Sequence, residues 1–119
     1  MNGGGGITSL VLRDGDTVLL GVVGELDLFT GPALVTVVTD CLRQRPTCLV
    51  MDVSAVSFCD AAGLTALEAA KDNAAQAGTR FTLTGVQPTL LRILTVTGLD
   101  ATLDLRPHHG QFPSAGATP

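Results

Sequence analysis

A chain of 119 residues, of which 45% are hydrophobic and 15% charged, has the size of one domain and is too apolar for a disordered regulator. Its formal net charge of −4, its seven scattered Lys and Arg residues and its lack of Trp and Tyr argue against direct nucleic-acid binding. No run approaches the roughly 18 consecutive apolar residues of a membrane span, so we expect no membrane partner.

The two ends of the chain differ from its middle. Residues 1–6 are rich in Gly, and residues 107–119 mix Pro, Gly, Ser and Thr without periodicity, so we expect flexible ends around one domain at 7–106. Residues 1–6 also lack the features of a secretory signal. The three cysteines are an odd number, which predicts reduced thiols and a cytoplasmic location.

The first half of the domain is predicted to form a hairpin and a helix. Two β-rich runs, 7–13 and 17–23, flank an Asp-Gly-Asp sequence that is typical of a hairpin turn. The helix is expected to begin at Thr30 or Gly31, with Pro32 in its first turn. Its apolar residues recur with the helical period, at Leu34, Val37, Val38, Cys41 and Leu42.

The second half alternates strands and helices. A near-continuous apolar run predicts a buried parallel strand at 48–53, followed by a loop at 54–59. Asp60 is a good N-cap for a helix at 61–77, and Gly78 suits the position after its end. A strand at 81–84, a helix at 88–97 and an edge strand at 102–105 complete the pattern. This order predicts an α/β fold: a mixed sheet with an N-terminal hairpin, then β-α-β crossovers, with helices packed on it.

Most catalytic signatures are missing from the predicted domain. His108 and His109 lie in the C-terminal tail, so no Cys–His or Ser–His pair is expected inside the domain. The N-terminal glycines are not followed by the Lys-Ser/Thr of a phosphate loop. Cys41 and Cys48 lack the spacing of a zinc knuckle, so we expect both thiols to be buried in the core. We therefore predict a protein that is not an enzyme and that uses no cofactor or metal.

Cys59 and Asp60 are the best candidates for chemistry, because they lie between a buried strand and a helix. Helix dipoles lower a thiol pKa at such a position, and α/β sheets place functional loops at this end of their strands. However, the neighbouring carboxylate opposes thiolate formation, and the domain offers no base to assist it. We interpret Cys59 as a packing thiol and Asp60 as an N-cap that can also contribute to recognition.

Three segments in this order resemble the STAS domain of bacterial anti-sigma-factor antagonists: residues 22–27 (VVGELD), 49–64 (LVMDVSAVSFCDAAGL) and 97–100 (TGLD). The resemblance implies a STAS-like fold and a protein-binding module. Its partner would be an anti-sigma factor, a histidine-kinase-like ATPase with serine kinase activity, through which it controls transcription indirectly. In this family the kinase phosphorylates a Ser directly after the loop Asp, and the added charge of about −1.5 to −2 ends the association.

The sequence departs from the family pattern at the phosphoacceptor. The family's Asp-Ser-Ser/Thr-Gly is Asp-Ala-Ala-Gly here, so Ala61 holds the phosphoacceptor position and offers no oxygen. Ser57 and Thr65 are the nearest hydroxyls, although each is also explained as a turn or surface residue. The resemblance places the partner-binding surface at Asp27, Ser57, Cys59, Asp60, Ala61, Ala62, Gly63 and Leu64.

Several alternatives stay open at this stage. Asp27 is also explained as a solvated carboxylate at a strand end, and Ala61 and Ala62 as good helix formers. Gly63 would permit close approach of a partner or of the helix to the sheet, so we expect Gly63→Ala to stabilise the fold slightly and to weaken binding. The family's usual C-terminal helix is not expected after Pro107. Two other functions fit the same fold: a STAS subunit of another assembly, such as a lipid-transport complex or stress-sensing scaffold, and a small-ligand or nucleotide sensor.

Overall fold

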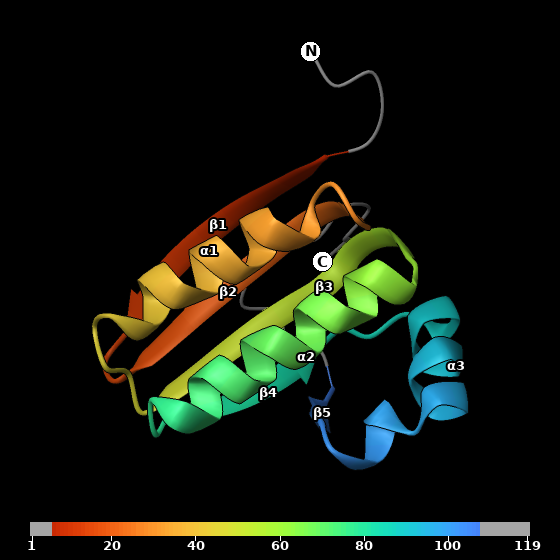
Figure 1. The fold of residues 1–119 in the computed structure, drawn as a ribbon. Coiled ribbons are helices and arrows are strands. Elements are labelled where there is room, and N and C mark those ends of the chain that lie inside the picture. Colours follow the sequence, from red (N-terminus) through yellow and green to blue (C-terminus); the bar gives the residue numbers. More distant parts are fainter. Residues whose placement is uncertain (1–5, 108–119) are drawn as a thin grey trace, which may run out of the picture.

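A five-stranded mixed sheet organises residues 6–107, the part of the chain described by the structure, a computed structural model (Figure 1). The elements in chain order are β1 (Ile7–Asp14), β2 (Thr17–Leu26), α1 (Gly31–Leu42), β3 (Cys48–Cys59), α2 (Ala61–Gln76), β4 (Arg80–Thr84), α3 (Pro88–Thr97), the 3-10 helix η1 (Leu99–Ala101) and β5 (Asp104–Arg106). This arrangement confirms the predicted α/β fold.

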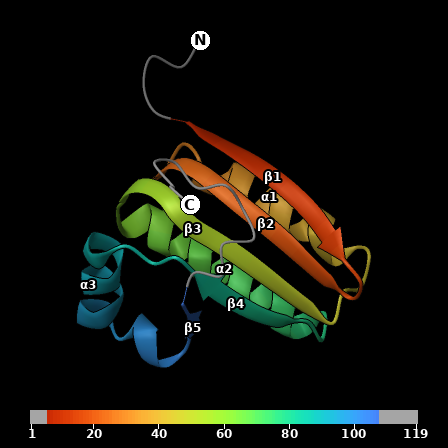
Figure 2. The same cartoon turned by 180° about the vertical axis from the view of Figure 1, so that it is seen from behind.

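The sheet has the strand order β1-β2-β3-β4-β5. The hairpin strands β1 and β2 are antiparallel, whereas β2, β3, β4 and β5 run parallel to one another. Helices α1 and α2 cover the same face of the sheet and lie behind it in the reverse view (Figures 1 and 2). The carboxyl ends of β2 and β3 therefore meet at one edge, where α1 and α2 begin.

The core lies between this sheet face and the helices. Alternate residues of β2, β3 and β4 point into it, as the two-residue repeat of a strand requires. Aliphatic side chains of ordinary size fill it, because the sequence supplies few aromatic residues. Its fully buried members include Val18, Leu20, Val22, Leu49, Met51, Val53 and Leu83 from the strands, and Leu34, Val38, Leu67, Ala70 and Leu94 from the helices.

The largest difference from the sequence prediction is in β3. Residues 54–59 are not a loop: β3 continues to Cys59, and β2 continues from Val23 to Leu26. Their parallel pairing persists to the Leu26–Cys59 pair through two register shifts, after Gly21 and Gly24. Such irregularities let strand pairing resume after a local interruption. Apolar periodicity within one strand carries no information about this pairing.

The helices agree more closely with the prediction. α3 has the predicted bounds, and Gly98 ends it in the left-handed region at φ +80°, where a glycine is favoured. Gly78 follows α2 at φ +74°. α2 ends at Gln76 rather than at the predicted residue 77, and Ala77 is its exposed C-cap. The final strand begins at Asp104 rather than at residue 102, because η1 precedes it.

Two further predictions about single regions have different outcomes. Cys41 is buried as expected, but Cys48 is only half-buried, because it lies at the start of β3 outside the main core. The predicted absence of a C-terminal helix and the predicted place of His108 and His109 lie outside the described residues. Within residues 6–107, no helix is long and apolar enough to cross a membrane.

Candidate functional site

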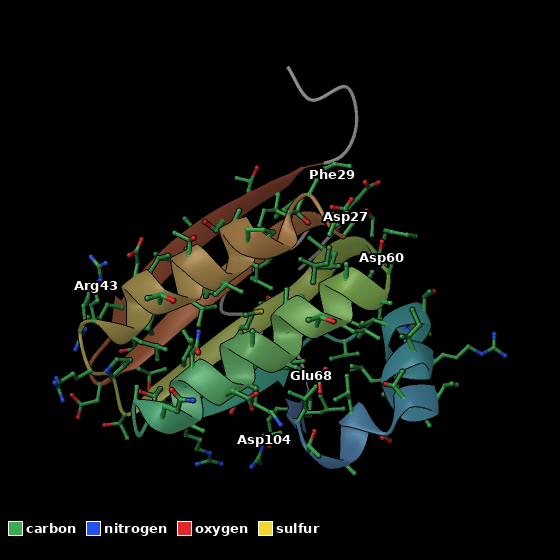
Figure 3. The ribbon with its side chains drawn as sticks, viewed as in Figure 1. Asp27, Phe29, Arg43, Asp60, Glu68 and Asp104 are labelled. Carbon is green, nitrogen blue, oxygen red and sulfur yellow. The ribbon has the colours of Figure 1, made fainter. Side chains whose placement is uncertain are left out.

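The ends of β2 and β3 bring the predicted acidic residues together. Leu26 and Cys59 are register partners, and the Asp60 N–H donates to the Leu26 carbonyl oxygen at 3.2 Å. Asp27 and Asp60 follow these two residues directly, and both carboxylates lie at the same end of the helical layer (Figure 3). Two turns, distant in sequence, therefore form one continuous edge of the molecule.

The Asp60 turn starts α2. Asp60 has an extended backbone, its Oδ1 accepts a hydrogen bond from the Gly63 N–H at 2.9 Å, and its carbonyl oxygen accepts from the Leu64 N–H at 2.9 Å. These bonds confirm the predicted N-cap. Ala61 is exposed and Ala62 is half-buried, so the first turn of α2 presents small side chains on its outer side.

Gly63 and Leu64 face the interior instead. A Cβ atom at Gly63 would lie 2.7 Å from the carbonyl carbon of Leu26 and 2.8 Å from its Cβ. The missing side chain lets α2 approach the end of β2, and Leu64 is buried in the core. Contrary to the expectation from helix propensity, alanine at position 63 has no room. Any role of these two residues in partner binding is limited to their backbone and to the position of the helix.

Cys59 is buried beside Asp60. Burial raises the pKa of the Cys59 thiol to about 11, and the negative charge of Asp60 contributes to the same rise. The Sγ atom lies 3.6 Å from the Asp60 carbonyl oxygen, at the long end for a sulfur donor. A protonated, enclosed thiol is a poor nucleophile. These observations favour the interpretation of Cys59 as a packing thiol.

The Asp27 turn is a tight network before α1. The Asp27 Oδ1 accepts hydrogen bonds from the N–H groups of Phe29 at 2.9 Å and Thr30 at 3.0 Å. The Thr30 hydroxyl donates to the Glu25 carbonyl oxygen at 2.7 Å and accepts from the Asp27 N–H at 3.0 Å. Thr30 is the N-cap residue of α1, but its side chain makes no capping bond. Its hydroxyl is already engaged within the turn.

Two residues that the sequence reasoning missed lie on this turn. Leu28 is 69% exposed and Phe29 is 86% exposed. A cavity of about 310 Å³ lies next to them between α1 and α2, and its lining includes Leu28, Gly31, Ala62, Thr65 and Ala66. The sequence signal was present: two large apolar residues follow the Gly-Glu-Leu-Asp motif in a turn, outside any helical or strand period.

The remaining predicted site residues lie in two different surroundings. Ser57 is exposed on β3, and its hydroxyl donates to the Gly24 carbonyl oxygen at 3.3 Å. Together with Cys59 it lines a second cavity, of about 370 Å³, between β3 and α3. Thr65, on the exposed side of α2, donates to the Ala61 carbonyl oxygen at 3.1 Å. The structure thus brings Asp27, Asp60, Ala61 and Ala62 together on one outer edge.

The chemistry of this edge follows from the side chains that it exposes. Among residues 6–107, no group of three or more His, Cys, Asp or Glu side chains is placed to hold a metal ion. The edge instead offers exposed small and apolar side chains at the start of two helices, next to two carboxylates. Exposed apolar side chains that cluster on a folded protein commonly mark an interaction site.

A mixed sheet with an N-terminal hairpin and three parallel crossovers is the architecture of a STAS domain. The STAS domain family model matches residues 9–112, and the chain belongs to that family. The anti-sigma-F factor antagonist RsfB of Mycobacterium tuberculosis is 32% identical over 99 residues, which cover 83% of this chain and 80% of RsfB.

Solved structures agree with this assignment. A crystal structure of an anti-sigma factor antagonist from Mycobacterium paratuberculosis matches with a TM-score of 0.74 and 34% identity, over 83% of this chain and 84% of that one. The anti-sigma factor antagonist SpoIIAA in its unphosphorylated form shares the fold at 17% identity, with a TM-score of 0.72 and coverage of 87% and 90%. The resemblance predicted from the sequence is confirmed at the level of the family.

Proposed function

We propose that this protein is an anti-sigma-factor antagonist that sequesters an anti-sigma factor of the histidine-kinase-like ATPase type and so controls transcription indirectly. The names of its relatives support this function. The observation that carries it is the outer edge at the start of α2, where Asp60, Ala61 and Ala62 lie beside the Asp27 turn. Small side chains in the first turn of a helix let the backbone of a partner approach closely.

We further propose that the usual phosphorylation switch is absent. Ala61 directly follows the N-cap Asp60 and is exposed, so a kinase could reach this position but would find a methyl group. The hydroxyls of Ser57 and Thr65 are engaged by the backbone carbonyls of Gly24 and Ala61. The protein would then remain competent to bind its partner at all times, and its amount in the cell would set its activity.

The binding surface is tested with an Ala62→Arg variant and purified anti-sigma factor of the same organism in isothermal titration calorimetry. The bulky charge is expected to weaken binding more than tenfold, equivalent to about 1.4 kcal/mol, with an unchanged far-UV spectrum. Ala75→Arg is the matched control, because Ala75 is an exposed alanine at the other end of α2. Wild-type affinity in the Ala62→Arg variant would place the interface elsewhere.

The missing switch is tested by incubating the protein with its partner kinase and ATP and measuring intact mass. The wild type is expected to gain no phosphate, whereas Ala61→Ser is expected to gain one on the same loop. Stoichiometric phosphate on the wild type at Ser57 or Thr65, with loss of binding, would show that a switch operates at a shifted position.

A small-ligand sensor is the second candidate, and the 370 Å³ cavity between β3 and α3 favours it. The polar side chains of its lining are Ser, Thr and Gln, and none of its lining residues is charged. Nucleotide phosphates are usually bound by cations or by helix N-termini, so this cavity suits a neutral molecule better. Calorimetry with ATP and GTP is expected to show no binding, and submicromolar affinity for either would support a nucleotide sensor.

A further inference from the structure

Leu28 and Phe29 form an exposed apolar tip on the turn between β2 and α1, hereafter the Leu28–Phe29 tip. With 86% of its surface exposed, Phe29 gains almost nothing from the fold of its own chain. A large aromatic side chain held in water is unfavourable. Exposed apolar clusters on folded proteins typically mark interaction sites.

The backbone beneath this tip is held in one conformation. The Asp27 carboxylate accepts from the N–H groups of Phe29 and Thr30, the Gly31 N–H donates to the Asp27 carbonyl oxygen at 2.9 Å, and Thr30 ties the turn to Glu25. An aromatic side chain on such a turn has only two rotatable bonds to fix on binding. Preorganisation of this kind lowers the entropic cost of association.

The charge around the tip indicates the kind of partner. Asp27 directly precedes the tip, and Asp60 lies farther along the same end of the helical layer, whereas Arg43 lies at the opposite end of α1 (Figure 3). Acidic side chains next to the tip oppose insertion into an anionic lipid surface. They complement a protein pocket that is apolar at its centre and basic at its rim.

The tip also adjoins the groove between the two helices. Leu28 lines the 310 Å³ cavity together with Ala62, which belongs to the edge of the proposed interface. A partner seated on the start of α2 would therefore reach Leu28 without leaving the same surface. The tip and the Asp60 turn form one continuous docking area.

We propose that the Leu28–Phe29 tip is the anchor of the complex, with Phe29 inserted into an apolar, basic-rimmed pocket of the anti-sigma factor. This inference rests on the proposed function, and it adds the residue that contributes most to affinity. Aromatic anchors near the centre of an interface commonly dominate its binding energy.

The experiment measures the affinity of purified anti-sigma factor for the wild type and for Phe29→Ala, Phe29→Leu and Val96→Ala by calorimetry. Phe29→Ala is expected to weaken binding more than tenfold, and Phe29→Leu to recover part of this loss. Val96 on α3 is the matched control, because it is 81% exposed and lies on another element. The affinity of the wild type is expected to fall as salt increases, because salt screens the attraction between the carboxylates near the tip and the basic rim.

Each outcome separates the anchor from the function on which it rests. If Phe29→Ala binds within twofold of the wild type while Ala62→Arg loses binding, the anchor is wrong and the proposed function stands. If the wild type does not bind the anti-sigma factor, both are overturned. The wild type is also tested for self-association by sedimentation and for binding to vesicles of anionic lipid. The anchor is overturned if Phe29→Ala abolishes either of these interactions while its affinity for the anti-sigma factor stays unchanged.

Discussion

The Asp60 and Asp27 turns follow neighbouring, register-paired strand ends, yet they use the same side chain differently. Asp60 caps α2 through the Gly63 N–H, and Gly63 brings that helix close to the sheet. Asp27 binds the N–H groups of Phe29 and Thr30 before α1 begins. One carboxylate thus fixes the packing of a helix, whereas the other holds two apolar side chains out in water.

What differs between the turns is the sequence after each Asp. After Asp60 come two alanines and a glycine, which fit a helix start pressed against β2. After Asp27 come Leu28 and Phe29, which stay exposed although both are large and apolar. The Asp60 turn therefore contributes to the stability of the fold, whereas the Asp27 turn presents the side chains proposed for recognition. Four measurements test this difference between the two turns.

The largest expected effect concerns Cys59, the residue before the Asp60 turn. Its pKa of about 11, against 9.0 for the free thiol, leaves about a hundredfold less thiolate at pH 7.5. Labelling of Cys59 by iodoacetamide, read by peptide mass spectrometry, should be at least that much slower in the folded protein than in urea. Its rate should rise with pH up to about pH 11. A plateau near pH 9 would contradict the raised pKa.

Gly63→Ala should destabilise the fold by about 1–3 kcal/mol, the usual cost of overpacking, because its Cβ would strike the end of β2. This exceeds the gain of up to about 1 kcal/mol in helix propensity. Urea unfolding followed by far-UV circular dichroism measures the change. Gly31→Ala is the matched variant at the start of α1, where the Cβ would meet the Ala66 methyl at 3.2 Å and the Ala62 carbonyl oxygen at 3.8 Å. Gly31→Ala should lower the free energy of unfolding by less than Gly63→Ala does. Equal decreases in the two variants would show that the two helix starts are packed equally tightly.

Asp60→Ala and Asp27→Ala should each cost about 1 kcal/mol, the typical value for a lost cap or hydrogen bond. Their local effects should differ. Asp60→Ala should speed amide hydrogen exchange at Gly63, and Asp27→Ala at Phe29 and Thr30, because these N–H groups lose their acceptors. The Asn variants keep an acceptor oxygen and should restore most of the protection. Faster exchange at both turns in either variant would show that they act as one unit.

The smallest effect on stability should come from Phe29→Ala. Because the ring is exposed, its removal should change the free energy of unfolding by no more than about 0.5 kcal/mol, as for most surface substitutions. The same urea titration measures this. A decrease of more than about 2 kcal/mol in the free energy of unfolding would mean that Phe29 packs against its own chain. It would contradict the interpretation of Phe29 as an exposed side chain available to a partner.

The sequence by itself determined the features that depend on a few neighbouring residues. Pro88 and Gly98 delimit α3, because proline favours a helix start and glycine adopts the left-handed conformation at its end. Asp60 caps α2 through a group three residues away. The three motif segments in their order were enough for the family, and the order of the predicted strands and helices was enough for the α/β architecture.

Only the tertiary structure decided the features that depend on distant partners. β3 extends to Cys59 because β2 lies beside it, a pairing that no local pattern encodes. Gly63 has no room for a methyl group because Leu26 of another strand occupies that space. Leu26 is buried and Phe29 is exposed although both are apolar and only three positions apart. The hydrophobicity of a side chain determines how much free energy its burial would gain. The packing of elements that are distant in the sequence determines which side chains are buried.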